Sequence, residues 1–312
     1  MATKLQTGAP EGPADRRMIL GLRLGGLGEG AELAERGGLD FVLLDNSTTP
    51  DAPIGADPLS VAAFLMSKTQ HIGLAASVPD SWAPFNVARA LASFDHLSGG
   101  RCGWLTWPGA GEPANPRRSA EHLDVVLQLF DSWDDDALAF DKAASVFADR
   151  DKVRRIRHSG PYFTVDGPLN APRPPQGRPV LFQRGHPVSP AADIELVDLE
   201  DAEPRPVRPI GAPLRLAEVI VDLGGAPAGR WAALAESLAD AFRERCDGFL
   251  LAPADPTDDV ALLIGEVIPR LVAQGALAPS TIGGDFRTRL GLARPVNRFA
   301  VADTALAKPA QP

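Results

Sequence analysis

The stretch IGLAASVPDSWAPFNVARALASFDHLSGGRCGWLT, residues 72–106, contains the unit from which the fold is built. Small and apolar residues at 72–77 and 102–106 predict two short buried strands, because parallel strands covered on both faces are apolar throughout. Residues 84–97 lie between them and carry apolar side chains at helical spacing, which predicts an amphipathic helix. A strand, a helix and a second strand in this order indicate a parallel βαβ unit.

The same alternation extends along the chain in both directions. It predicts eight strands, at Met18–Leu24, Phe41–Leu44, Ile72–Ser77, Cys102–Thr106, Val180–Gln183, Ile194–Leu199, Arg215–Asp222 and Gly248–Leu251. The predicted helices are Gly30–Arg36, Pro58–Thr69, Pro84–Leu97, Ser119–Trp133, Trp231–Arg245 and Asp258–Gln274. Eight alternating strands favour an α/β fold of the (β/α)₈ TIM-barrel type over an open doubly wound sheet. A truncated or irregular barrel is the alternative, because residues 183–215 leave little room for full helices.

A single barrel domain is expected over residues 18–298, with a β-hairpin inserted near 156–169, where the pattern alternates about Ser159-Gly160. Residues 1–17 are polar, rich in Gly and Pro, and lack the apolar core of a secretory signal, so we expect a disordered leader there. The polar, Pro-containing residues 299–312 predict a disordered tail.

Composition narrows the classes of partner. The chain has 312 residues and a net charge of −9, which repels phosphate backbones and disfavours nucleic acid. It has no apolar run of about 18 residues, which argues against a membrane span. Two cysteines, Cys102 and Cys246, are too few for a disulfide framework, so we expect reduced thiols and a cytoplasmic protein. Neither H-E-x-x-H nor another metal-ligand spacing occurs, so no metal site is predicted.

A glycine-rich turn after the first strand offers one candidate binding motif. Residues 26–31, GLGEGA, satisfy G-x-G-x-x-A, and Asp45 ends the second strand, as in a dinucleotide-binding fingerprint. The turn can instead be a simple connection between a barrel strand and its helix. We favour this interpretation because glycine-rich turns are common in a chain with 30 glycines.

Residues 94–104, FDHLSGGRCGW, resemble the signature D-x-L-S-G-G-R-x-G-W of bacterial luciferase-like, flavin-dependent monooxygenases, particularly the nitrilotriacetate monooxygenase branch. Residues 129–137, LFDSWDDDA, are similar to its L-W-D-S-W-x-D-D-A. Four further blocks resemble that branch, and the resemblance covers roughly residues 18–298. These blocks are residues 158–170, 175–180, 246–249 and 289–295.

The resemblance implies a luciferase-type barrel, reduced FMN supplied by a separate flavin reductase, and insertion of one oxygen atom from O₂ into a small organic substrate. In such an enzyme the flavin carries the oxygen chemistry, while the protein anchors the phosphate and keeps the cavity dry. A barrel enzyme places its site at the C-terminal ends of its strands. The candidate cofactor-binding residues there are Asp45, Ser77, Thr106, Gln183, Arg184, Gly185 and His186.

The sequence departs from the family pattern at these strand ends. Leu105 stands where the family has an Asn, and an alkyl group cannot hydrogen-bond to a flavin ring. The family's Q-A-G-x-S, whose serine and amides hold the phosphate, is replaced by Gln183-Arg184-Gly185-His186-Pro187. Pro187 has neither hydroxyl nor N–H, and the loop at 108–118 and the insertions that cover the site are short. We therefore expect a degenerate flavin site with weakly bound or absent FMN.

Several of the quoted residues have structural alternatives. Asp45 can contact a ligand or cap the turn that contains Ser47. Arg184 and His186 can replace the lost phosphate contacts by charge, although loop Arg and His are more often solvated. We interpret His96 and Arg101 as packing residues, and residues 134–136 as a solvated capping face.

Three functions remain open from the sequence. The first is an FMN-dependent monooxygenase, the second a flavin-free barrel that serves as a structural or regulatory subunit, and the third a nicotinamide-dependent reductase using the Gly26 turn. We also expect a homodimer or pairing with a paralogous chain, because large aromatic residues gather on the third and fourth helical segments. These residues are Trp82, Phe85, Phe94, Phe130 and Trp133.

Overall fold

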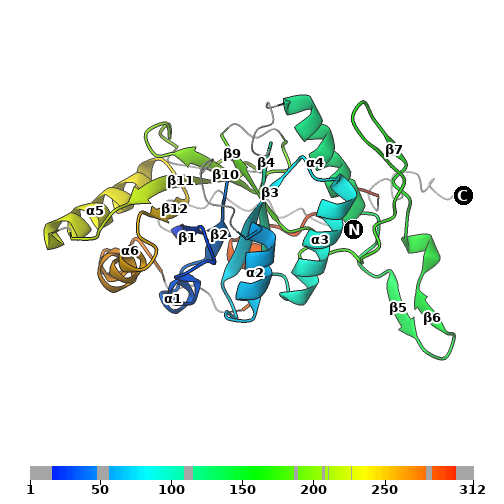
Figure 1. Cartoon of the computed structure of the whole chain (residues 1–312), viewed down its shortest axis with the longest axis horizontal. Helices are drawn as coiled ribbons and strands as arrows, with labels where there is room; N and C mark the ends of the chain where they lie inside the picture. Colours follow the sequence, from blue (N-terminus) through cyan, green and yellow to red (C-terminus); the bar gives the residue numbers. More distant parts are fainter. Residues whose placement is uncertain are drawn as a thin grey trace, which may run out of the picture.

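The computed structural model describes residues 16–47, 56–108, 115–185, 189–205, 208–209, 211–225, 227–278 and 283–299. Eight parallel strands close into a barrel in the order β1-β12-β11-β10-β9-β4-β3-β2, which confirms the predicted TIM-barrel class (Figure 1). The strands are β1 Ile19–Leu24, β2 Phe41–Leu44, β3 Gly73–Pro79, β4 Cys102–Trp107, β9 Val180–Arg184, β10 Ile194–Asp198, β11 Leu214–Val221 and β12 Gly248–Pro253. Each overlaps a predicted strand, because each is a short apolar run.

Helices surround the barrel where the sequence has amphipathic segments. They are α1 Ala31–Arg36, α2 Pro58–Met66, α3 Pro84–Leu97, α4 Pro116–Phe130, α5 Ala228–Glu244, α6 Asp258–Leu262 and α7 Ile268–Ala273, with a π-helical turn at Leu263–Val267. Helix α4 begins three residues before the predicted Ser119. The side chain of Asn115 caps it by accepting a hydrogen bond of 3.1 Å from the amide of Arg118, and Pro116 occupies the first turn.

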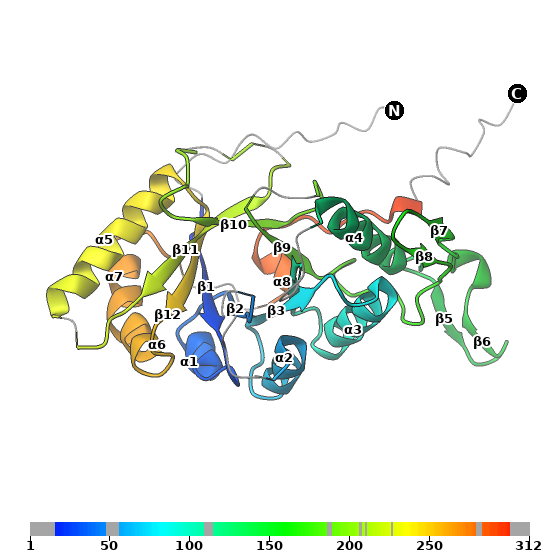
Figure 2. The ribbon, with the colours of Figure 1, turned by 45° about the horizontal axis from the view of Figure 1, so that its top comes forward.

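The barrel is irregular on one side. Among the described residues, no helix follows β9 or β10 (Figure 2). The short sequence between residues 183 and 215 had suggested this alternative. In the part of the chain that the structure describes, the strands on this side therefore have no outer helical layer like that over the rest of the barrel.

Aromatic rings fill the N-terminal end of the barrel. The short helix α8, Phe286–Arg289, places Phe286 inside, with its ring centroid 5.8 Å from that of Phe41 and 6.4 Å from that of Phe182. Glycines on the strands make room for these rings. A Cβ at Gly73 would lie 2.5 Å from Phe286, and one at Gly21 would lie 2.2 Å from Phe41. Phe286 is fully buried, so its ring is part of the packed interior at this end.

Two small antiparallel hairpins lie outside the barrel. Strands β7 His158–Ser159 and β8 Thr164–Val165 pair within the segment expected to form a hairpin. A second hairpin, β5 Leu138–Asp141 with β6 Val146–Ala148, was not predicted. Its turn holds no glycine, and Phe140 and Ser145 themselves adopt positive φ values of 47° and 55°. The usual turn signal was therefore missing from the sequence.

The acidic residues after α4 hold other segments in place as well as facing solvent. Asp135 and Asp136 are exposed, as predicted, whereas Asp134 is only partly exposed. Asp131 and Asp135 bind the buried guanidinium of Arg173 at 2.9 and 2.8 Å. Asp134 pairs with Arg154 at 2.6 Å, and Asp135 also pairs with Arg294 near the C-terminus at 2.6 Å. Ion pairs formed from side chains this distant in sequence fix the position of each segment.

The predicted aromatic patch is not a continuous surface. Phe94 and Phe130 are buried in the core, and Phe85 packs against it. Trp133 donates a hydrogen bond of 2.7 Å from its Nε1 to the carbonyl of Leu169. Trp82 is the most exposed of the five, at 40%. These rings mainly seat their helices on the barrel, so they do not form the dimer surface that was expected.

Residues 1–15 of the predicted leader and 300–312 of the predicted tail lie outside the described residues. Arg16 pairs with Asp247 at 3.0 Å, and Arg17 pairs with the buried Asp40. Within the described part of the chain, no helix combines the length and apolar character needed to cross a bilayer.

Candidate functional site

Charged side chains occupy the interior of the barrel at the C-terminal ends of its strands. Strand alternation explains their position, because each lies two residues beyond an inward-facing residue at a lower layer. Asp45 follows Leu43, Arg184 follows Phe182, and Glu218 follows Leu216; these apolar residues belong to the inner core of the barrel. With Arg23 on β1, the set Arg23, Asp45, Arg184 and Glu218 forms what we call the mouth network.

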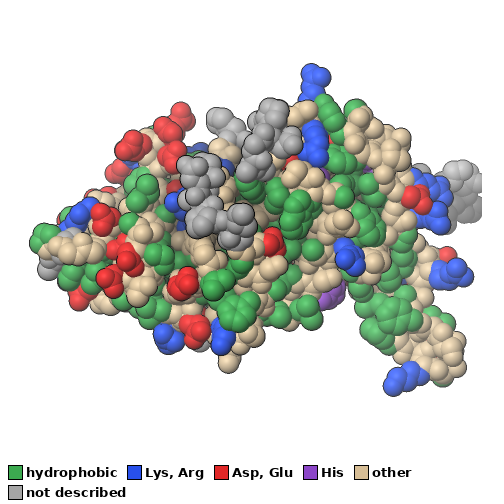
Figure 3. Space-filling view, viewed as in Figure 1, with side chains coloured by type: hydrophobic (Ala, Val, Ile, Leu, Met, Phe, Trp, Pro, Cys, Tyr) green, Lys and Arg blue, Asp and Glu red, His purple; other side chains and the backbone are tan. Residues whose placement is uncertain are grey.

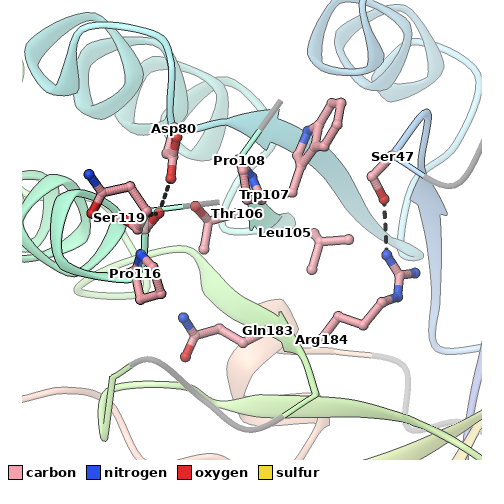
Figure 4. A pocket seen from close by; sticks show the side chains of 11 residues that line it. Ser47, Asp80, Leu105, Thr106, Trp107, Pro108, Pro116, Ser119, Gln183 and Arg184 are labelled. Atoms are coloured by element: carbon pink, nitrogen blue, oxygen red, sulfur yellow. Dashed lines mark hydrogen bonds between the residues drawn. The ribbon is translucent and has the colours of Figure 1, made fainter. Parts of the chain in front are cut away.

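The mouth network is continuous from β1 through β11 and β9 to β2. Arg184 donates from Nε and Nη2 to the two carboxylate oxygens of Glu218, at 2.8 Å each. It also donates from Nη2 to Asp45 Oδ2 at 3.1 Å and from Nη1 to Ser47 Oγ at 2.9 Å, the latter drawn in Figure 4. Arg23 approaches Glu218 at 3.5 Å. The guanidinium of Arg184 is thus held by three neighbouring side chains.

The electrostatics of Arg184 follow from these contacts. Burial alone would lower its pKa, but the hydrogen bonds and charges of Glu218 and Asp45 raise it above its ordinary value. The side chain of Asp45 is fully buried, and that of Glu218 is mostly buried. Two carboxylates and two guanidinium groups balance in charge, so the mouth network is neutral without any ligand.

The remaining predicted site residues have varied surroundings. Ser77 Oγ accepts a hydrogen bond of 3.2 Å from the amide of Asn46, and Gln183 Oε1 accepts one of 3.3 Å from the amide of Ser189. Gly185 has a φ of 70°, which only glycine adopts without strain, and its amide donates to Leu196. Thr106 lines a pocket described next. His186 lies outside the described residues, as does Pro187.

A cavity of about 440 Å³ lies beside the mouth network, between β4, β9 and the start of α4 (Figure 4). Its volume is in the range of small-molecule sites. Its walls are mainly apolar, and Gln183 and Arg184 border it on the β9 side. The full lining is Ser47, Asp80, Leu105, Thr106, Trp107, Pro108, Asn115, Pro116, Ser119, Gln183 and Arg184.

Asp80 organises the opposite wall of this cavity. Its carboxylate accepts hydrogen bonds from Ser119 Oγ and from Arg118 Nη1, the latter at 3.0 Å. Asp80 is therefore engaged with α4. Trp107, across the cavity, has a buried Nε1 for which the described residues provide no acceptor.

Sequence reasoning placed Asp45 and Arg184 at the barrel mouth but missed Arg23, Ser47, Glu218 and Asp80. Glu218 carried a usable signal, because a charged residue inside a predicted buried strand must find a partner or face the strand ends. Asp80 lies just beyond the third predicted strand, where a site residue is expected. Their partners are distant in sequence and become visible only when the barrel closes.

The described residues of the mouth do not fit the phosphate of FMN. Arg184, the cation expected to bind it, already donates four hydrogen bonds to Glu218, Asp45 and Ser47. A phosphate would meet two carboxylates as well as the guanidinium groups. Leu105 is fully buried and offers no hydrogen bond to a flavin ring. No catalytic step through flavin follows from this arrangement.

The glycine-rich turn serves the backbone and the packing of α1. Gly26, Gly28 and Gly30 have φ values of 56°, 75° and 97°, and a Cβ at Gly28 would lie 2.7 Å from Leu65. The turn opens a helix of six residues in a closed barrel, whereas a dinucleotide fold has an open sheet. Asp45, the expected ribose ligand, is paired with Arg184. These contacts do not support the reductase hypothesis.

Arg101 of the signature segment has the structural role that was predicted, whereas His96 is exposed, with its Nε2 3.3 Å from the carbonyl oxygen of Pro172, and is not a packing residue. Arg101 is buried and donates to Thr69 Oγ1 at 2.9 Å and to the carbonyl of Ser98 at 3.1 Å. Asp95 is fully buried and accepts a hydrogen bond of 2.6 Å from Gln176 Nε2, while Gln176 Oε1 accepts one of 2.9 Å from the amide of Arg287. This segment links α3 to the helix that closes the barrel.

Fold and sequence together define the class of protein. Residues 6–197 match the family model of luciferase-like monooxygenases, and the chain belongs to that family. No grouping of three or more His, Cys, Asp or Glu side chains placed to hold a metal occurs in the described part of the chain.

Several individual proteins are similar to this chain over different parts of their length. The chain is 37% identical over 279 residues to one of the subunits of pristinamycin IIA synthase from Streptomyces pristinaespiralis, covering 89% of this chain and 92% of that protein. It is 36% identical over 185 residues to nitrilotriacetate monooxygenase component A of Aminobacter aminovorans, covering 49% of this chain but only 41% of that protein. EDTA monooxygenase from Chelativorans sp. BNC1 shares the fold, with a TM-score of 0.74 at 21% identity, over 89% of this chain and 99% of that structure.

Proposed function

We propose that this chain is a flavin-free barrel subunit of a luciferase-like monooxygenase, and that it works by pairing with a flavin-bearing barrel of the same family. The observation that carries the proposal is the mouth network. Glu218, Asp45 and Ser47 engage Arg184 at the position where a phosphate anchor was expected. The chain therefore satisfies internally the group that a cofactor would otherwise bind.

The charges of the mouth network oppose the binding of a phosphate to Arg184. At an effective dielectric constant of about 20, a phosphate about 5 Å from a carboxylate is repelled by about 3 kcal/mol per unit charge. Asp45 and Glu218 would both repel it, and the attraction of Arg184 and Arg23 is already balanced. To free Arg184 would also leave two largely buried carboxylates with weaker partners.

The comparison with a named subunit supports the same function. The relative from Streptomyces pristinaespiralis, which matches along most of both chains, is named as one subunit of a synthase, and such a name implies at least one other subunit. The match to nitrilotriacetate monooxygenase component A spans less than half of that protein. This chain therefore aligns with nearly the whole synthase subunit but with less than half of the monooxygenase component.

A second candidate function is that of an FMN-dependent monooxygenase acting on a small organic substrate with a separate flavin reductase. The cavity of about 440 Å³ favours it, because its apolar walls and the amide of Gln183 could enclose a small organic molecule. The two functions differ in a measurable way, since only the second requires the chain to bind FMN by itself.

Fluorescence titration with FMN and with riboflavin separates them. The flavin-free subunit should bind FMN no more tightly than riboflavin, because the phosphate has no anchor. Mixing with a flavin-bearing luciferase-like chain from the same organism should yield a complex with higher turnover than that chain alone. FMN binding at least tenfold tighter than riboflavin, with substrate oxidation by this chain and reduced FMN, would establish the second function instead.

A further inference from the structure

Two polar side chains of the cavity beside the barrel mouth take no part in the mouth network. Thr106 follows the inward-facing Leu105 on β4. Gln183 follows the inward-facing Phe182 on β9, and Phe182 is the strand partner of Leu105. Because side chains alternate along a strand, Thr106 and Gln183 face away from the barrel axis, and Figure 4 shows both on the side of the cavity where Pro116 of α4 lies. They are therefore neighbours on adjacent strands, beside the axis and not on it.

The side-chain amide of Gln183 is buried with one of its ends unused. Gln183 is 3% exposed, and its Oε1 accepts a hydrogen bond of 3.3 Å from the amide of Ser189. This contact fixes which end of the group faces the cavity, and the two N–H donors of its Nε2 have no partner among the described residues. Thr106 Oγ1 likewise makes no hydrogen bond within the described part of the chain. A ligand atom that accepts from the buried amide therefore gains more than it would from the same contact in water.

Both charged side chains that line the cavity are already paired. Asp80 is bound by Arg118 at 3.0 Å and by Ser119, and Arg184 is held by the carboxylates of the mouth network. The face seen in Figure 3 carries most of its acidic side chains over α5 and α6, away from α4. An ionised ligand would lose its water in the cavity without meeting an unpaired opposite charge, which is costly. The cavity, with its mainly apolar walls, therefore suits a neutral molecule.

We propose that this cavity binds a neutral, mainly apolar molecule that carries a carboxamide, and that it does so in the absence of flavin. The carboxamide oxygen accepts from Gln183 Nε2, and the carboxamide N–H donates to Thr106 Oγ1. A primary amide or a lactam matches this pair because it has an acceptor and a donor on one edge, whereas a ketone or an ester has no such donor. The volume of about 440 Å³ admits the amide together with an attached ring or chain. The proposal goes beyond the proposed function, because it needs neither a partner barrel nor FMN.

Isothermal titration of the full chain with three ligands that differ in one terminal group tests the proposal. 3-Phenylpropanamide should bind about tenfold or more tightly than 3-phenylpropanoate, because the carboxylate brings an unpaired charge into the cavity. It should bind several-fold more tightly than 4-phenylbutan-2-one, which has the same oxygen but a methyl group in place of the N–H donor. Thr106→Val should remove the preference for the amide over the ketone. Thr164→Val is the matched control, because Thr164 is exposed on β8 outside the barrel and should leave the preference unchanged.

Two further variants locate the binding. Gln183→Leu removes the donor to the carbonyl oxygen and should weaken the amide and the ketone alike by several-fold; its melting temperature is measured as well, because it also loses the contact with Ser189. Thr106→Phe fills the cavity and should abolish the binding of all three ligands.

The proposal is overturned if 3-phenylpropanamide does not bind, if the three ligands bind equally, if the carboxylate binds best, or if the amide still binds to a folded Thr106→Phe variant. Thr106→Val alone decides the role of the pair if Gln183→Leu does not fold. The titrations with FMN and riboflavin test the flavin-free subunit separately, because no flavin is present in these measurements.

Discussion

Glu218 and Arg184 are joined by two hydrogen bonds of 2.8 Å, although their strands are not neighbours. Strand β10 lies between β11 and β9, so the pair crosses the interior of the barrel mouth. A bidentate pair of this kind is directional and stronger than a contact between single point charges. It closes the interior above the apolar layer, at the strand end where the sequence predicted a phosphate anchor.

The first prediction concerns Glu218→Gln. Loss of this carboxylate removes one repulsive charge and releases the Nε and one Nη of Arg184. FMN binding should then become several-fold tighter than riboflavin binding, whereas the wild type should show no such preference. Isothermal titration of both ligands measures the ratio. Ser60→Ala, at an exposed helix start that makes none of the contacts of the mouth network, is the control, and an unchanged FMN to riboflavin ratio in Glu218→Gln would contradict the prediction.

The second prediction is that Arg184 and Glu218 are energetically coupled. Arg184→Met leaves Asp45 and Glu218 with fewer partners and should lower the free energy of unfolding by about 1–3 kcal/mol, a value reduced by the partial exposure of Arg184. The double variant Arg184→Met/Glu218→Met should cost less than the sum of the single variants by about 1 kcal/mol or more. Urea denaturation of the four proteins gives the cycle. Simple additivity would show that the pair contributes little.

The third prediction is a pH dependence of stability at Asp95. Burial raises the pKa of Asp95 from 3.8 to about 6, against the opposing hydrogen bonds of Gln176 and Cys102. The folded state therefore binds a proton more readily than the unfolded state between these values. This group should make the free energy of unfolding rise, by up to about 3 kcal/mol, as the pH falls from about 7 to about 4.

Urea denaturation at several pH values, for the wild type and Asp95→Asn, isolates this contribution. The variant cannot ionise at this position, so the difference between the two proteins should change with pH in the direction given. Parallel profiles between pH 5 and 7 would show that the carboxyl of Asp95 does not titrate there.

The fourth prediction tests the aromatic layer at the closed end of the barrel. Gly73→Ala places a Cβ 2.5 Å from the buried ring of Phe286 and should destabilise the protein by about 1–3 kcal/mol. Gly25→Ala is the matched control, because a Cβ there meets nothing within 4 Å. Thermal unfolding compares the two, and equal melting temperatures would show that α8 moves aside without cost.

The barrel could be predicted from sequence because its strands are local signals. Phe41–Leu44 and Val180–Arg184 are short apolar runs, and each lies between clear loop residues. The hairpin of β5 and β6 could not be predicted in the same way, because Phe140 within β5 and Ser145 before β6 adopt a conformation that sequence patterns assign to glycine. Helix α8 has four residues, too few to show helical periodicity.

The candidate site was predictable residue by residue but not as a network. Asp45 and Arg184 stand at strand ends, where their positions follow from the strand boundaries alone. They are 139 residues apart in the sequence, and only the closure of the barrel brings them into contact. The partner Glu218 lies inside a strand, and the register that points it inward is set by pairing with β10 and β12. This register cannot be derived from the sequence of a single chain.

Phe286 enters the barrel from a position late in the chain, and β1 pairs with β12. During synthesis the first five barrel strands therefore leave the ribosome before the residues that cover their open edges and their interior exist. Until β12, Gly248–Pro253, has emerged, β1 presents an unpaired edge, and until Phe286 has emerged the Phe41 layer lacks its third ring. Exposed strand edges and apolar faces favour aggregation, so the incomplete chain is more prone to aggregate than the closed barrel.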